Sequence, residues 1–116
     1  MREFESGATR NDDTEQNDYE GFLSPLVIEA YGDYMHKNRL QADGKLRSSD
    51  NWQKGIPQNE YMKSLWRHFL GLWKIHRGHK VFNRDGFEIT KIEMMMAILF
   101  NVMGYAHELL TKGEPR

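Results

Sequence analysis

Apolar residues recur at three- and four-residue spacing in three stretches of this chain, the pattern of helices with one packed face. The clearest stretch covers residues 57–77, and its apolar positions are Tyr61, Met62, Leu65, Trp66, Phe69, Leu70, Trp73 and Ile75. Pro57 suits a first helical turn because its missing N–H needs no partner there, and Gly78 is a natural terminator. The pattern predicts a helix over residues 57–77 whose apolar stripe is core.

A second helix is predicted directly after Ser24 and Pro25. Serine is a favoured N-cap residue and proline a favoured first-turn residue. One side of the stretch that follows is apolar and carries Leu26, Val27, Ala30, Tyr31, Tyr34 and Met35. We therefore expect a helix that begins at this Ser-Pro pair.

The last predicted helix runs from about Phe87 to Lys112, with Gly113 as its terminator. Its middle is apolar nearly all round, which is typical of a helix that is buried on several sides or lies at a subunit interface. A stripe of polar and small residues interrupts it at steps of three or four, namely Glu93, Ala97, Asn101, Gly104 and Glu108. We expect a homo-oligomer that forms through this helix.

Two other segments show no apolar periodicity. Residues 1–22 are polar and rich in acids, which predicts an extended, mobile N-terminal arm. Residues 38–56 hold turn formers and charges, but Trp52 favours an ordered loop because a large ring in a polar loop usually packs against something. No stretch is typical of a strand. The predicted fold class is all-α, a small bundle of three main helices with a long ordered loop and the arm, in which residues 23–116 form one domain.

Length, charge and cysteine content narrow the class of protein. A chain of 116 residues is the size of one domain. Its 16 Lys and Arg residues nearly balance its 17 Asp and Glu residues, so no global field favours nucleic acid or a membrane surface as a partner. Cysteine is absent, the N-terminus lacks the apolar segment of a signal peptide, and the longest apolar run, Met94–Phe100, is far shorter than a membrane span. We expect a cytoplasmic protein.

The loop Lys45–Lys54 is the first candidate site. It combines cations, hydroxyls, amides and an indole within ten residues. Arg47 and Lys54 can hold phosphates through charge-assisted hydrogen bonds, and Trp52 can stack on a base. A solvated loop that one tryptophan holds in place explains the same residues without a ligand.

The second candidate site lies on the two longest predicted helices. Arg67 and His68 interrupt the apolar pattern of one helix, and Glu93 and Asn101 interrupt that of the other. A buried carboxylate or amide is costly unless it is paired. If the helices pack antiparallel, these side chains can converge in a cleft that suits a small ligand. A structural network of hydrogen bonds is the alternative.

Several short motifs occur in a recognisable order along nearly the whole chain. They are GATR (7–10), LSP (23–25), DNWQKGIP (50–57), YMKSLWRH (61–68) and ILFNVMGY (98–105). In combination they resemble small phage proteins of the dATP/dGTP diphosphohydrolase, N-terminal domain family. That family is similar in kind to MazG-like all-α pyrophosphohydrolases, which cleave a nucleoside triphosphate between its α- and β-phosphates. The resemblance implies a phage-encoded, α-helical protein of the host cytoplasm that handles purine deoxynucleotides.

The resemblance also implies roles for individual residues. Such hydrolysis uses Mg²⁺ to neutralise phosphate charge and activate water, and Glu60 and Glu93 are the expected catalytic residues and metal ligands. The expected ligand-binding residues are Arg47, Lys54, Arg67 and His68 for the phosphates, Trp52 and the adjacent Asn51 at the base, and Asn101 for the metal or the sugar.

Two other functions stay open. The MazG-like strings Glu-Glu-x-x-Glu and Glu-x-x-Asp do not occur on the two longest predicted helices. Their absence there favours a non-catalytic protein that sequesters a nucleotide or a cyclic nucleotide, for instance to blunt a host defence. The methionine-rich last helix is also compatible with a protein–protein interaction module that binds no small ligand.

Overall fold

The structure is a computed structural model that describes residues 2–10 and 14–114. The helices within these ranges are α1 (Tyr19–Phe22), α2 (Pro25–Lys37), α3 (Gln58–His76) and α4 (Lys91–Lys112), and a 3-10 turn, η1 (Asn51–Lys54), precedes α3. Two short strands, β1 (Arg2–Glu3) and β2 (Thr9–Arg10), pair antiparallel. None of the described helices is long and apolar enough to cross a membrane. The predicted all-α class is confirmed.

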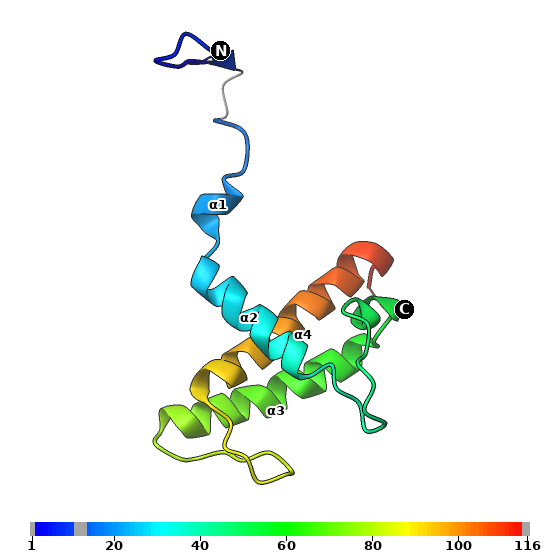
Figure 1. Cartoon of the computed structure of the whole chain (residues 1–116). Coiled ribbons are helices and arrows are strands. Elements are labelled where there is room, and N and C mark those ends of the chain that lie inside the picture. The colour runs from blue at the N-terminus through cyan, green and yellow to red at the C-terminus, as the bar shows by residue number, and fades with distance from the viewer. Residues whose placement is uncertain (1, 11–13, 115–116) are drawn as a thin grey trace.

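The N-terminal arm contains more local structure than predicted. The strands β1 and β2 are joined by a turn in which Gly7 donates its N–H to the carbonyl of Phe4 at 2.8 Å. Further along, the Asp18 side chain accepts a hydrogen bond from Gly21 N and caps α1. Two acidic residues of the predicted arm, Asp12 and Asp13, lie outside the described residues. Figure 1 shows this segment running away from the three longer helices.

Helices α3 and α4 form the main packed unit and run antiparallel (Figure 1). Tyr61 near the start of α3 lies against Gly104 in the second half of α4, whereas Gly71 lies against Met94 in the first turn of α4. Along the contact, residue numbers on α4 therefore decrease as residue numbers on α3 increase, which is the arrangement of antiparallel helices. The antiparallel packing on which the second candidate site depended is present.

Helix α4 begins four residues later than predicted, and the prediction of a start near Phe87 was wrong. The Asn83 side chain accepts hydrogen bonds from the backbone N–H groups of Asp85 and Phe87, both at 3.0 Å, and holds those residues in a turn. Thr90 is the N-cap instead. Its side chain accepts from Glu93 N, while the Glu93 side chain accepts from Thr90 N, which makes a capping box.

Helix α2 crosses the α3–α4 pair on the α4 side (Figure 1). Ser24 caps it and Pro25 opens it, as predicted. Near the C-terminal end of α2, Lys37 Nζ lies 2.8 Å from Glu93 Oε2. This ion pair ties the end of α2 to the start of α4, so Glu93 has both a capping role and an interhelical role.

The core of the single chain is small. Its buried apolar side chains are Tyr61, Met94, Met96 and Ala97. The stripe of polar and small residues on the last helix faces α3 at Gly104, and Ala97, Asn101, Gly104 and Glu108 are all buried. The fifth member, Glu93, is half-buried and pairs with α2 instead. Small residues there allow the two helices to approach closely, and Tyr61 fills the space above Gly104.

The predicted apolar stripe of α3 is core only in part. Tyr61 is 1% exposed, but five large side chains of the predicted stripe are exposed in the single chain. They are Met62, Trp66, Phe69, Leu70 and Trp73, and we call them the open stripe. A helix turns by about 100° per residue, so these five occupy one arc of α3 and Tyr61 points along another. The sequence pattern combined two apolar faces into one.

Candidate functional site

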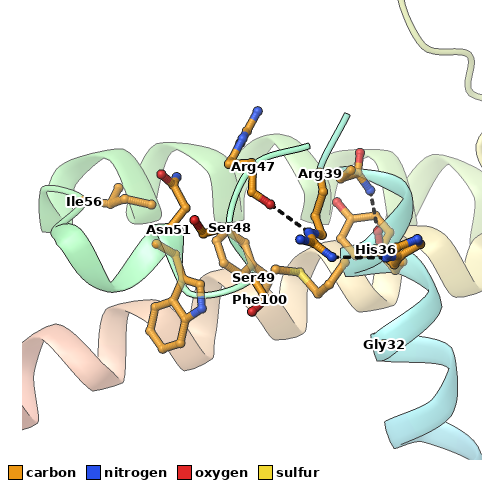
Figure 2. A pocket seen from close by; sticks show the side chains of 13 residues that line it. Gly32, His36, Arg39, Arg47, Ser48, Ser49, Asn51, Ile56 and Phe100 are labelled. Atoms are coloured by element: carbon orange, nitrogen blue, oxygen red, sulfur yellow. Dashed lines mark hydrogen bonds between the residues drawn. The ribbon is translucent and has the colours of Figure 1, made fainter. Parts of the chain in front are cut away.

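A cavity of about 600 Å³ lies between the C-terminal half of α2, the loop that follows it, η1 and the middle of α4. Figure 2 draws the side chains of its lining residues. The residues that line it are Gly32, Tyr34, Met35, His36, Asn38, Arg39, Arg47, Ser48, Ser49, Asn51, Trp52, Ile56 and Phe100. Its volume is in the range of pockets that hold drug-sized ligands, which is roughly 300–1,000 Å³.

The wall formed by the loop is built around Arg39. Arg47 N donates to Arg39 O at 2.8 Å, and Arg39 Nε donates to Arg47 O at 2.7 Å. A bridge between Leu40 and Leu46 continues this pairing, and Gly44, with φ of 83°, allows the tight turn at its tip. The loop after α2 therefore forms an ordered, hairpin-like turn, in agreement with the predicted ordered loop.

Aromatic side chains form the other wall. Trp52 is half-buried and meets His107 of α4 edge-on, with ring centroids 4.9 Å apart. Phe100 of α4 and Tyr34 of α2 also line the cavity. Burial raises the pKa of Tyr34, and the nearby Glu93 carboxylate raises it further. The Tyr34 hydroxyl is therefore a neutral donor at physiological pH.

The polar side of the cavity is cationic. Arg39 and Arg47 supply guanidinium groups, and His36 Nδ1 lies 3.4 Å from Arg39 Nη1. None of the described residues that line the cavity is acidic. Figure 2 shows the Arg47 side chain extending outward from the rim, while the Arg39 guanidinium lies inside, between His36 and the Arg47 carbonyl. A fixed cation within and a free-standing cation at the rim favour an anionic ligand.

Three of the residues predicted from the first loop line this cavity, namely Arg47, Asn51 and Trp52. Lys54 ends η1 and does not line it. The hydroxyls of Ser48 and Ser49 do line it, and Asn51 N donates to Ser48 O at 3.1 Å, which shapes the entry into η1. The loop prediction therefore located one wall of the cavity.

The helix residues of the second candidate site do not line the cavity. Arg67 is exposed and donates to Ser64 Oγ at 2.9 Å. His68 is half-buried, and its pKa is lowered first by that burial and then by Arg67. Asn101 is 4% exposed and donates from Nδ2 to the Ala97 carbonyl at 2.9 Å. Asn101 thus has a partner within its own helix, which agrees with the structural alternative for that residue.

Sequence reasoning missed the contribution of α2. Tyr34, His36 and Arg39 come from its last turns and from the residues just beyond. The only sequence signal is the basic cluster HKNR at residues 36–39, which by itself is typical of any helix C-terminus. The crossing of α2 over α4 brings these residues opposite the loop, and no local pattern encodes that crossing.

The residues present in one chain do not fit a shared magnesium ion. Glu60 is in the first turn of α3 and Glu93 is in the first turn of α4, where it neighbours Met94 and hence Gly71. The two carboxylates are separated by roughly 15 Å along α3, whereas two ligands of one Mg²⁺ lie within about 4 Å of each other. Among the described residues, no three His, Asp or Glu side chains gather as a metal site. Glu93 is also engaged by Lys37 and Thr90.

No family model, curated protein or solved structure matches this chain. The geometry of the cavity therefore carries the functional argument, and the family resemblance stays a prediction.

Proposed function

We propose that this protein binds a purine nucleotide in the cavity between α2, the loop after it and α4. The observation that carries the proposal is the division of the cavity into an aromatic wall and a cationic wall without an acidic lining residue. Trp52 and Phe100 provide the surfaces for a base, and Arg39 and Arg47 provide the charge for phosphates. The family resemblance supplies the ligand class, purine deoxynucleotides.

The two walls assign different tasks to their residues. Arg39 is held by the Arg47 carbonyl and by His36, so it offers a pre-oriented charge at a fixed place. The Arg47 side chain is free to close over a phosphate because its structural role is carried by its backbone alone. Ser48, Ser49 and Asn51 supply neutral hydrogen-bonding groups between the two walls.

Binding without hydrolysis is the favoured form of this function. Glu60 and Glu93 are far apart in one chain, and Glu93 is already paired. A phosphohydrolase of the expected kind therefore needs carboxylates that one chain does not bring together. A protein that sequesters a nucleotide or a cyclic nucleotide needs only the cavity, which makes it the better match to the geometry.

Titration calorimetry with dATP and dGTP tests the proposal, with and without Mg²⁺. The informative variant is Arg47→Met, which removes the rim cation but keeps both backbone hydrogen bonds to Arg39. The matched control is Arg84→Met, which removes an exposed loop arginine that does not line the cavity. We expect Arg47→Met to weaken binding by about 10-fold, as for one lost charge-assisted hydrogen bond, and Arg84→Met to leave it unchanged.

The fate of the ligand separates the two forms of the function. Phosphorus NMR of the incubated mixture would show intact nucleotide for a sequestering protein, and pyrophosphate with a nucleoside monophosphate for a hydrolase. Failure to bind dATP, dGTP or any cyclic nucleotide at millimolar concentration would refute nucleotide binding. Equal weakening by both methionine variants would refute the assignment to this cavity.

A further inference from the structure

The open stripe of α3 is an exposed apolar surface that nucleotide binding does not use. Trp66, Phe69 and Trp73 are 69%, 55% and 57% exposed, and Met62 and Leu70 extend the same surface. The five residues fall within about 100° of the helix circumference, with no charged residue among them. A soluble monomer rarely leaves a contiguous apolar surface of this kind in water.

An apolar groove adjoins this stripe. It has a volume of about 270 Å³ and is lined by Met62, Leu65, Trp66 and Phe69 of α3 and by Ile98 of α4. On the α4 side the apolar surface continues through Met95 and Val102, which are 40% and 50% exposed. Helices α3 and α4 therefore present one apolar layer, and α2 contacts α4 from another side.

The buried core of a single chain is small beside this uncovered layer. Only four apolar side chains are buried among the described residues. A second copy of the same chain is present wherever the chain is, so it can cover the layer at all times.

We propose that the open stripe and its groove form the interface of a homodimer, in which the same surface of a second copy covers them. A two-fold interface uses one self-complementary patch on both chains. This surface contains both a groove and a projecting stripe. The groove of one copy can receive Leu70 or Trp73 of the second copy, and the stripe of the first copy can fill the groove of the second. The product is a four-helix arrangement of two α3–α4 pairs.

The available area is sufficient for a stable dimer. The three aromatic residues alone expose roughly 350 Å² per chain, taking about 200 Å² for a large aromatic side chain. Met62, Leu70, Ile98, Met95 and Val102 add to it and bring the apolar surface toward the roughly 800 Å² per partner of a standard interface. The interface lies mainly on α3, whereas the composition of the last helix had pointed to α4.

Sedimentation velocity and light scattering of the full chain, from low to high micromolar concentration, test this proposal. We expect the unmodified chain to be a dimer and the double variant Trp66→Glu/Leu70→Glu to dissociate with at least a roughly 30-fold higher Kd, as for the loss of an interface hot spot. The matched control is Leu110→Glu. Leu110 is 87% exposed on α4 and lies outside the stripe and the groove, so the control should remain a dimer.

Cross-linking keeps the test decisive if the double variant unfolds. The chain contains no cysteine, so Leu70→Cys introduces a single thiol per chain at the proposed interface. Short bis-maleimide reagents should link two copies of Leu70→Cys and should not link Leu110→Cys. A folded, strictly monomeric unmodified chain would overturn the proposal. A dimer that the double variant leaves intact would place the interface elsewhere and would equally overturn it.

Discussion

The closest approach of α3 to α4 predicts a small effect for one glycine-to-alanine substitution and a large loss of stability for another. A Cβ atom added at Gly104 would lie 2.5 Å from Tyr61 Oη and nearer still to ring atoms Cε1 and Cζ. A Cβ atom added at Gly71 would lie 2.5 Å from Met94 Cε and 3.1 Å from Met94 Sδ. Neither glycine has a positive φ, so backbone conformation does not separate the two sites.

The side chain that must move decides the size of each change in the free energy of unfolding. Alanine in place of glycine inside a helix contributes about 1 kcal/mol of stability, and overpacking a core costs roughly 1–3 kcal/mol. The Met94 thioether is flexible and can shift, so Gly71→Ala should change the free energy of unfolding by less than about 1 kcal/mol. Tyr61 is rigid and 1% exposed, so Gly104→Ala should destabilise the protein by about 2 kcal/mol, or roughly 8 °C in Tm.

Thermal and urea unfolding followed by circular dichroism measures both effects, at matched protein concentration because the proposed dimer would add to stability. The double variant Gly104→Ala/Tyr61→Leu should recover part of the loss, since leucine has no ring at the site of the clash. A Gly104→Ala variant as stable as the unmodified chain would refute the close packing of α3 on α4. So would a Gly71→Ala variant that is the less stable of the two.

Three further predictions concern capping and titration. Thr90→Ala removes the acceptor for Glu93 N and should destabilise the protein by about 1 kcal/mol in chemical unfolding. The pKa of Glu93 is lowered chiefly by its hydrogen bond to Lys37, against an opposing effect of burial and with help from Thr90. Its charged form therefore stabilises the fold above the ordinary glutamate range, and this stability is lost as pH falls through the lowered pKa. Glu93→Gln should be less stable than the unmodified chain at neutral pH, and this difference should shrink toward acid pH; a difference independent of pH would contradict the ion-pair role. The pKa of His68 is lowered below 6.5 by burial and then by Arg67, so the unfolded chain takes up a proton that the folded chain resists. Stability should fall as pH drops from neutral to about 5.5, and His68→Gln should flatten this dependence in pH-dependent urea titrations; an unchanged slope would show that His68 is not responsible.

The sequence by itself determined the three longer helices and most of their ends. Ser24 with Pro25 and Gly113 lie where α2 begins and α4 terminates, because capping and proline effects act within a few residues. The start of α4 was missed because Asp85 and Phe87 are held in a turn by one side chain, Asn83. The helix start predicted near Phe87 and the true N-cap at Thr90 lie within one helical turn of each other, and the sequence pattern does not distinguish them.

The sequence also identified one wall of the cavity. Arg47, Asn51 and Trp52 were singled out because their residue types suit an anion and a base, and they lie together within six positions along the chain. The opposite wall, with His36 and Arg39, depends on α2 crossing α4, and this crossing is fixed by long-range contacts such as Lys37 with Glu93. Local periodicity contains no information about such a crossing.

Only the tertiary structure decided which apolar faces are core. Tyr61 and Trp66 belong to one apolar pattern in the sequence, yet one is buried and the other is 69% exposed. In the sequence, Asn101 and Glu108 interrupt the apolar pattern of the last helix, yet both are buried between α3 and α4. The physical reason is that an apolar pattern in the sequence shows which surfaces are unfavourable in water, but not which neighbour covers them. That neighbour is determined by how the helices pack. On α3 that choice leaves the stripe around Trp66 uncovered within one chain, which is why we propose a dimer there.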